Sequence, residues 1–187
     1  MSRCEGADGV THRVSITDWQ SALQIDADRL EKIVLRIIEC ERLAAAEISV
    51  AVVDDRRSHE LNLAHLQHDY PTDVLSFLLE QDPETDRDPL AEFPSTGLRI
   101  EGEVVVSAET ALREADRFGW SAEDELSLYV VHGVLHLCGY DDSRDDFRRA
   151  MRRREREVLK NWSLTPNYTE ERTGSGRCSD AAHSPSE

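Results

Sequence analysis

Residues 121–142, SAEDELSLYVVHGVLHLCGYDD, constrain the fold most, because they predict a helix that is buried on most of its sides. Ser121 and Asp124 have the spacing of a capping box, which marks a helix start. Apolar residues then recur at helical spacing as far as Leu137, and further apolar positions widen this stripe beyond one face. A helix of this kind needs neighbours on several sides, so the rest of the chain is expected to pack around it.

The segments around this helix predict alternating strands and helices. Strands are expected at 14–17, 47–55, 73–80 and 98–109, where β-branched residues gather or alternate with polar ones. Helices are expected at 22–43, 58–67, 110–119 and 143–162. Residues 80–97 hold three prolines and a run of acids, which predicts a surface loop.

The length and composition fit one domain. A chain of 187 residues buries enough apolar surface for a single core, which we place at residues 1–162. Residues 163–187 are polar and rich in Ser, Thr and Gly, so a disordered tail is expected there. With 38 acidic against 22 basic residues, the net charge of −16 argues against generic adhesion to nucleic acid or membranes.

The cysteines and the apolar runs indicate the compartment. The four cysteines are scattered, with no C-x-x-C pair, which is typical of a reducing cytosolic setting. No apolar run approaches the ~18 residues of a membrane span, and the first residues lack a signal-peptide pattern. A cytoplasmic protein is therefore expected.

His132 and His136 lie four positions apart on the core helix, so both imidazoles can face one point. Gly139 stands where a helix favours a left-handed residue, and such a reversal would bring Asp142 back beside the last turn. Two nitrogen donors and one oxygen donor with an open fourth position predict a site for one zinc ion. The alternative is a buried helix with two satisfied histidines, in which Gly139 is only a cap.

Three blocks of the sequence together resemble the YbeY family of bacterial metal-dependent endoribonucleases. They are HGVLHLCGYDD at 132–142, ELNLAHLQHDYPTDVLSF at 60–77 and IEGEVVVSAETA at 100–111. The resemblance implies an α+β fold with a small mixed four-stranded sheet, about five helices and a zincin-like metal helix. It also implies a zinc-dependent, single-strand-specific endoribonuclease that acts in rRNA maturation, at the 3′ end of the small-subunit rRNA, and in ribosome quality control. The partners would be rRNA and the small ribosomal subunit, with neither DNA nor a membrane.

The resemblance transfers residue by residue, with two departures. His132 and His136 correspond to catalytic zinc ligands, and Asp142 stands where the family has a third histidine. Asp141 matches the family's aspartate, as a turn residue or one that orients an imidazole. Leu66 stands where the family has an arginine. His65 and His68 are candidate substitutes for it, and the alternative is that both lie on an exposed polar face of a helix. Possible substrate contacts in the cleft are Thr72, Asp73, Ser76 and Arg148.

Two further functions compete with RNA hydrolysis. Leu66 and Asp142 also fit a zinc-stabilised ribosome-assembly factor with little or no catalytic activity. A zinc peptidase shares the histidine spacing, but its general base is a glutamate directly after the first histidine, and this position holds Gly133. Peptide hydrolysis is therefore not expected.

Overall fold

The structure, a computed structural model, describes residues 2–5, 11–81, 88–166 and 168. Its elements are β1 (Ser2–Glu5), β2 (Thr11–Asp18), α1 (Ala27–Cys40), β3 (Ala45–Val53), α2 (Asp55–Leu66), β4 (Val74–Gln81), β5 (Arg99–Ser107), α3 (Ala108–Phe118), α4 (Ala122–Leu137), α5 (Asp145–Leu159) and a 3₁₀ turn (Lys160–Trp162). The α+β class and the mixed sheet expected from the sequence are confirmed. No helix in the described part of the chain combines the length and the apolar character needed to cross a membrane.

The sheet has the order β1-β2-β3-β5-β4. β2, β3 and β5 run parallel, whereas β1 and β4 are antiparallel edge strands. All four strands expected from the sequence are present, and β1 adds a fifth. Ser2–Glu5 lacks the apolar alternation by which a strand is recognised in a sequence, and it joins the sheet by backbone pairing to β2.

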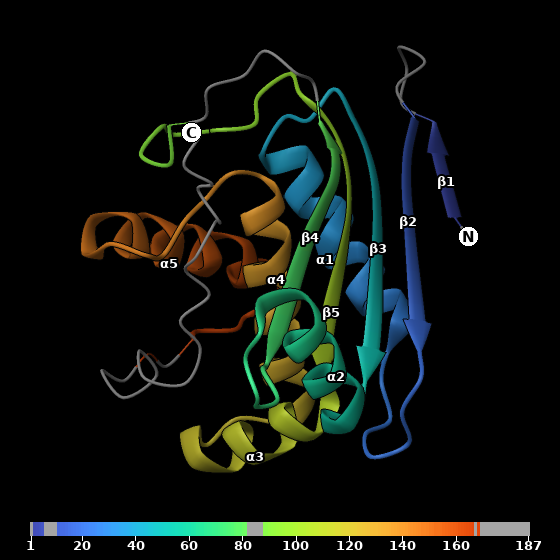
Figure 1. The fold of residues 1–187 in the computed structure, drawn as a ribbon. Coiled ribbons are helices and arrows are strands. Elements are labelled where there is room, and N and C mark those ends of the chain that lie inside the picture. Colours follow the sequence, from blue (N-terminus) through green and yellow to red (C-terminus); the bar gives the residue numbers. More distant parts are fainter. Residues whose placement is uncertain (1, 6–10, 82–87, 167, 169–187) are drawn as a thin grey trace, which may run out of the picture.

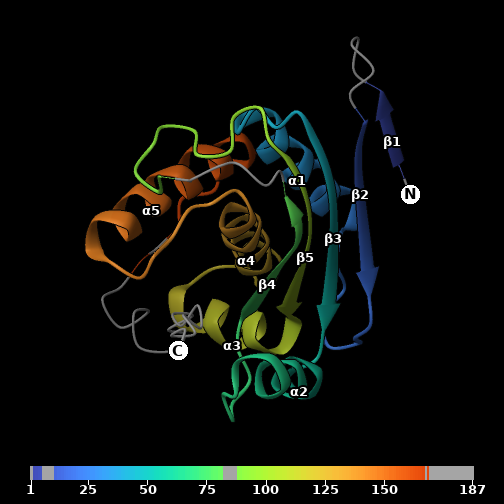
Figure 2. The same ribbon diagram turned by 45° about the horizontal axis from the view of Figure 1, so that its top comes forward.

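Helices cover the two faces of the sheet unequally (Figures 1 and 2). α1 and α4 pack on one face, and α5 lies outside α4, so α4 is enclosed between the sheet and α5 as the sequence predicts. The main core lies on this side. On the other face, α2 covers only one end of the sheet, where Leu61 and Leu66 pack against a small apolar cluster that includes Leu75 and Val105.

Local signals place α4 within this arrangement. The Ser121 side chain accepts a hydrogen bond from the Asp124 backbone N–H at 3.1 Å, which confirms the expected start of the helix. At the other end, Gly139 adopts φ +89°, and the Tyr140 N–H donates to the Leu135 carbonyl at 3.1 Å. This is a Schellman-type reversal, and it turns the chain back toward the histidines.

Gly133 lets α4 approach the sheet closely. A Cβ at this position would lie 2.5 Å from Val104 Cγ1 on β5 and 2.9 Å from Val74 Cγ2 on β4. Both are branched side chains on strands with little freedom to move. A glutamate, which the zinc peptidase alternative requires after His132, therefore has no space in this helix.

Candidate metal centre

The two histidines at the end of α4 face one another. Their Nε2 atoms are 3.0 Å apart, and the ring planes are inclined at 84°. This follows from the four-residue spacing, which places the two side chains one above the other on the helix. The side chains are 26% and 21% exposed, so the pair lies at the surface edge of the core, within reach of a substrate.

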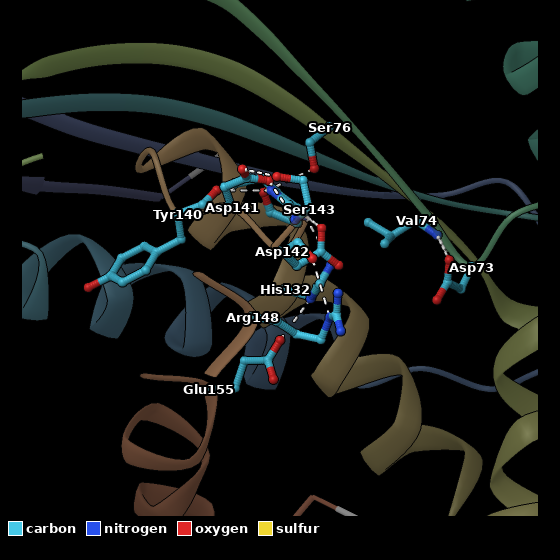
Figure 3. Close-up of polar contacts among 12 residues, drawn as sticks. Asp73, Val74, Ser76, His132, Tyr140, Asp141, Asp142, Ser143, Arg148 and Glu155 are labelled. Atoms are coloured by element: carbon cyan, nitrogen blue, oxygen red, sulfur yellow. Dashed lines mark hydrogen bonds and ion pairs between the residues drawn. The ribbon is translucent and has the colours of Figure 1, made fainter. Parts of the chain in front are cut away.

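Asp142 closes the group. Its carboxylate oxygens lie 4.0 Å from His132 Nε2 and 4.0 Å from His136 Nε2. A tetrahedral zinc with bonds of about 2.1 Å holds its ligand atoms about 3.4 Å apart, and the observed separations lie on both sides of that value. Figure 3 shows Asp142 and His132 directed toward each other. The reversal at Gly139 thus assembles three donors that can hold one metal ion.

The outer nitrogens of both rings are already bound. His132 Nδ1 lies 2.7 Å from Glu155 Oε1, and His136 Nδ1 lies 3.0 Å from the Tyr140 carbonyl oxygen. A carboxylate and a carbonyl accept hydrogen bonds, so each Nδ1 carries the hydrogen and each Nε2 turns its lone pair to the space between the rings. Two lone pairs 3.0 Å apart repel each other unless a proton or a cation lies between them. This donor set fits a divalent metal ion.

The charges around the pair separate the two histidines. Burial lowers the pKa of His132, but the hydrogen bond and the charge of Glu155 outweigh it and raise that pKa to about 9. Asp142 and Asp73 act in the same direction. Burial and the neighbouring charge on His132 lower the pKa of His136. These opposite shifts favour a single proton on the metal-free pair near neutral pH.

Asp141 and Arg148 lie beside the three donors. Asp141 accepts a hydrogen bond from the Ser143 backbone N–H at 3.0 Å, which serves the turn, and its charge acts to raise the pKa of His136. Arg148, on α5, donates from Nε to the Asp142 carbonyl at 3.3 Å and from Nη1 to Asp145 at 2.8 Å. The structure thus brings one guanidinium to the edge of the site.

The residues expected from β4 and the turn before it lie on the sheet side of the site. The Ser76 hydroxyl donates to the Gly133 carbonyl at 3.0 Å. Asp73 accepts from the Val74 N–H at 2.9 Å and from the Thr72 hydroxyl at 3.0 Å. Figure 3 places Asp73 apart from the His132–Asp142 group. These hydrogen bonds hold the turn and join β4 to α4; contact of these residues with a substrate stays a prediction.

The structure does not bring His65 or His68 to the metal donors by any hydrogen bond among the described residues. The His65 ring lies edge-on to Phe77, with centroids 4.9 Å apart, and the His68 ring stacks on Tyr70 at 5.4 Å. Leu66 packs into the small apolar cluster on the far side of the sheet. The segment around Leu66 therefore has a packing role here.

Sequence reasoning missed two residues near the site, Glu155 and Tyr168. Glu155 is 2% exposed and lies on the buried face of α5 with Met151, Val158 and Leu159. In the sequence, Glu155 occupies a position on the apolar face of the helix, which is unusual for an acid. The many charged residues beside it in the sequence make that pattern hard to recognise. Tyr168 belongs to the segment expected to be a tail, yet its hydroxyl donates to Glu155. Residues 167 and 169–187 lie outside the described residues.

Sequence comparison with known proteins identifies one family. The family model described as Endoribonuclease YbeY matches residues 15–163. The Endoribonuclease YbeY of Salinibacter ruber is 36% identical over 149 residues, covering 78% of this chain and 89% of its own. The protein of the same name from Heliobacterium modesticaldum is 37% identical over 127 residues, covering 68% of this chain and 76% of its own. The one from Pelotomaculum thermopropionicum is 42% identical over 120 residues, covering 64% of this chain and 74% of its own. Since the family model spans most of the chain, the chain belongs to the YbeY endoribonuclease family.

Proposed function

We propose that this protein is a zinc-dependent, single-strand-specific endoribonuclease. Its proposed task is rRNA maturation at the 3′ end of the small-subunit rRNA, together with ribosome quality control, in the cytoplasm. Its proposed partners are rRNA and the small ribosomal subunit, and neither DNA nor a membrane is included. The observation that carries the proposal is the group of His132, His136 and Asp142, whose donor atoms lie within 4.8 Å of one another in partly exposed side chains.

The proposed chemistry needs a metal and a cation near a phosphate. A zinc ion in such a site supplies Lewis-acid polarisation of a phosphate oxygen and lowers the pKa of a bound water to roughly 7. Asp142 contributes a negative charge where a third imidazole would be neutral, so the bound water should be less acidic than with three histidines. Arg148, anchored to the Asp142 carbonyl, is the described guanidinium best placed to meet the charge of a phosphate.

Cleavage of an RNA that carries the small-subunit rRNA 3′ end tests this proposal. Wild type is expected to cut the RNA, and both a chelator and His132→Ala should abolish cutting. His59→Ala is a matched control, because its ring pairs with Asp69 at 2.8 Å and no hydrogen bond among the described residues joins it to the three donors. Cleavage that survives the chelator would contradict the proposal.

Metal analysis tests the ligand set separately from activity. Purified wild type should hold about one zinc per chain, and Asp142→Ala should hold far less, because two imidazoles alone leave the site one ligand short. Equal zinc in both proteins would remove Asp142 from the ligand set.

A second candidate is a zinc-stabilised ribosome-assembly factor with little or no activity. Leu66 favours this candidate, because the leucine packs in an apolar cluster and supplies no cation to the site. This candidate predicts a zinc protein that binds small-subunit particles without turnover above background. Asp142→His should then raise cleavage sharply, and the absence of any gain would count against this candidate.

A further inference from the structure

Glu155 is a buried carboxylate with two donors. It lies on α5 and is 2% exposed. His132 Nδ1 meets Oε1 at 2.7 Å, and the Tyr168 hydroxyl donates to Oε2. A carboxylate away from water needs a donor at each oxygen, since an oxygen without one retains its full desolvation cost. Tyr168 therefore completes the hydrogen bonding of the group that holds His132.

Tyr168 is anchored at two points. It lies nine positions beyond Leu159, the last residue of α5. The guanidinium carbons of Arg152 and Arg156 each lie 4.8 Å from the centroid of its ring, a separation typical of cation–π contacts. The two arginines are four positions apart and so share one side of α5. The ring is held on that side while its hydroxyl points to Glu155.

The two metal histidines differ in what orients them. His136 donates to the Tyr140 carbonyl, a backbone group that no side-chain substitution removes. His132 depends on a side chain from another helix, and that side chain in turn depends on Tyr168. Without the tyrosine hydroxyl, Oε2 of Glu155 would lose its donor, and the carboxylate would be free to rotate away from the imidazole.

We infer that Tyr168 is a positioning residue of the metal centre: through Glu155 it fixes the His132 ring with Nε2 directed at the metal. Tyr168 thereby supports the site together with Glu155 of α5. This inference rests on the proposed metal site. Its test distinguishes a failure of the Tyr168 role from a failure of the metal site itself. A purely structural tyrosine would affect the stability of the fold and leave the affinity of the folded protein for metal unchanged.

The test measures metal affinity in the full-length chain, by competition between the protein and a chromophoric chelator for Zn²⁺ and Co²⁺. Outer partners of ligand histidines typically change metal affinity about 10–100-fold. Tyr168→Phe is expected to weaken binding about 10-fold, and Glu155→Gln by at least as much. The Co²⁺ absorption spectrum of Tyr168→Phe should also change, because the His132 ring is held less firmly. Tyr70→Phe is the matched control, since this exposed tyrosine stacks on His68 away from the site.

The double variant Tyr168→Phe with Glu155→Gln decides whether the tyrosine acts through the carboxylate. If it does, the double variant binds metal as weakly as Glu155→Gln alone, within a factor of about 2. If the affinity losses of the two single variants multiply in the double variant, the inference is overturned. It is also overturned if Tyr168→Phe has wild-type metal affinity and an unchanged Co²⁺ spectrum. If Glu155→Gln does not fold, the result for Tyr168→Phe decides alone. Those results leave the proposed function standing, whereas a wild type that binds no divalent metal would overturn both.

Discussion

Metal binding at this site is expected to release about one proton over a wide pH range. The reason is the pair of unequal histidines. Glu155 outweighs the effect of burial on His132 and raises its pKa to about 9, while burial and the charge on His132 lower the pKa of His136. Because these shifts are opposite, we expect the metal-free pair to hold one proton near neutral pH, between two Nε2 atoms 3.0 Å apart. An ion entering the site must displace it.

The magnitude follows from competition between one proton and one ion. Metal affinity should rise about tenfold per pH unit, or about 1.4 kcal/mol, between roughly pH 5 and 8, and level off near pH 9. The His132 contribution to the stability of the metal-free fold runs in the opposite direction. Its pKa, raised from 6.5 to about 9, adds stability that is fully present below pH 6.5 and is lost as the pH rises through 9. The lowered pKa of His136 removes stability as the pH falls below 6.5.

Calorimetric titration with Zn²⁺ in buffers of different ionisation enthalpy counts the protons. We expect about one at pH 5.5 and at least one at pH 7.5, where ionisation of a bound water adds to the count. Two histidines with ordinary pKa values would release about 1.8 protons at pH 5.5, where a bound water with a pKa of roughly 7 contributes little. A release near 1.8 protons at pH 5.5 in the wild type would refute the reasoning. Glu155→Gln should release fewer protons than the wild type at pH 7.5, since the charge that raises the pKa of His132 is removed.

Three substitutions test other parts of the structure. Gly133→Ala should lower the free energy of unfolding by about 1–3 kcal/mol in urea titrations, because its Cβ would overlap Val104 and Val74, and an unchanged midpoint would show that α4 can move away from the sheet. Arg154→Leu should cost about 3–5 kcal/mol in the same assay, because it removes the charged partner of the fully buried Glu41 carboxylate at 2.5 Å and leaves that carboxylate the Tyr140 hydroxyl alone as a donor among the described residues. Asp142→His should shift the pH profile of RNA cleavage to lower pH, because a neutral third ligand makes a bound water more acidic, and an unshifted profile would exclude Asp142 from the ligands.

The parts of the site that were predictable from the sequence are the local ones. The spacing of His132 and His136 on a helix, and the left-handed residue at Gly139, both follow from geometry within a few residues. The return of Asp142 to the histidines needed only that reversal. The middle strands of the sheet were also recognisable, because parallel strands buried on both faces are rich in β-branched residues.

The parts that were missed depend on contacts between distant segments. Glu155 is 23 positions from His132, and its partnership depends on how α5 crosses α4, which no local pattern specifies. Tyr168 follows in a polar stretch whose composition suggests a tail, yet its ring contacts Arg152 and Arg156 and its hydroxyl donates to Glu155. β1 was missed for a related reason, since edge pairing uses backbone groups and leaves no apolar pattern.

This division between local and distant contacts links metal binding to the packing of the last helix. α4 and the turn after it supply all three donors, but His132 is oriented only when α5 lies across α4 with Glu155 in place. A state in which α5 has detached keeps the His136–Tyr140 bond and loses the orientation of His132, so it should bind metal more weakly. By linkage, an ion that prefers the packed state must stabilise that packing to the same degree. The metal therefore supports the interface between α4 and α5 as much as that interface supports the metal.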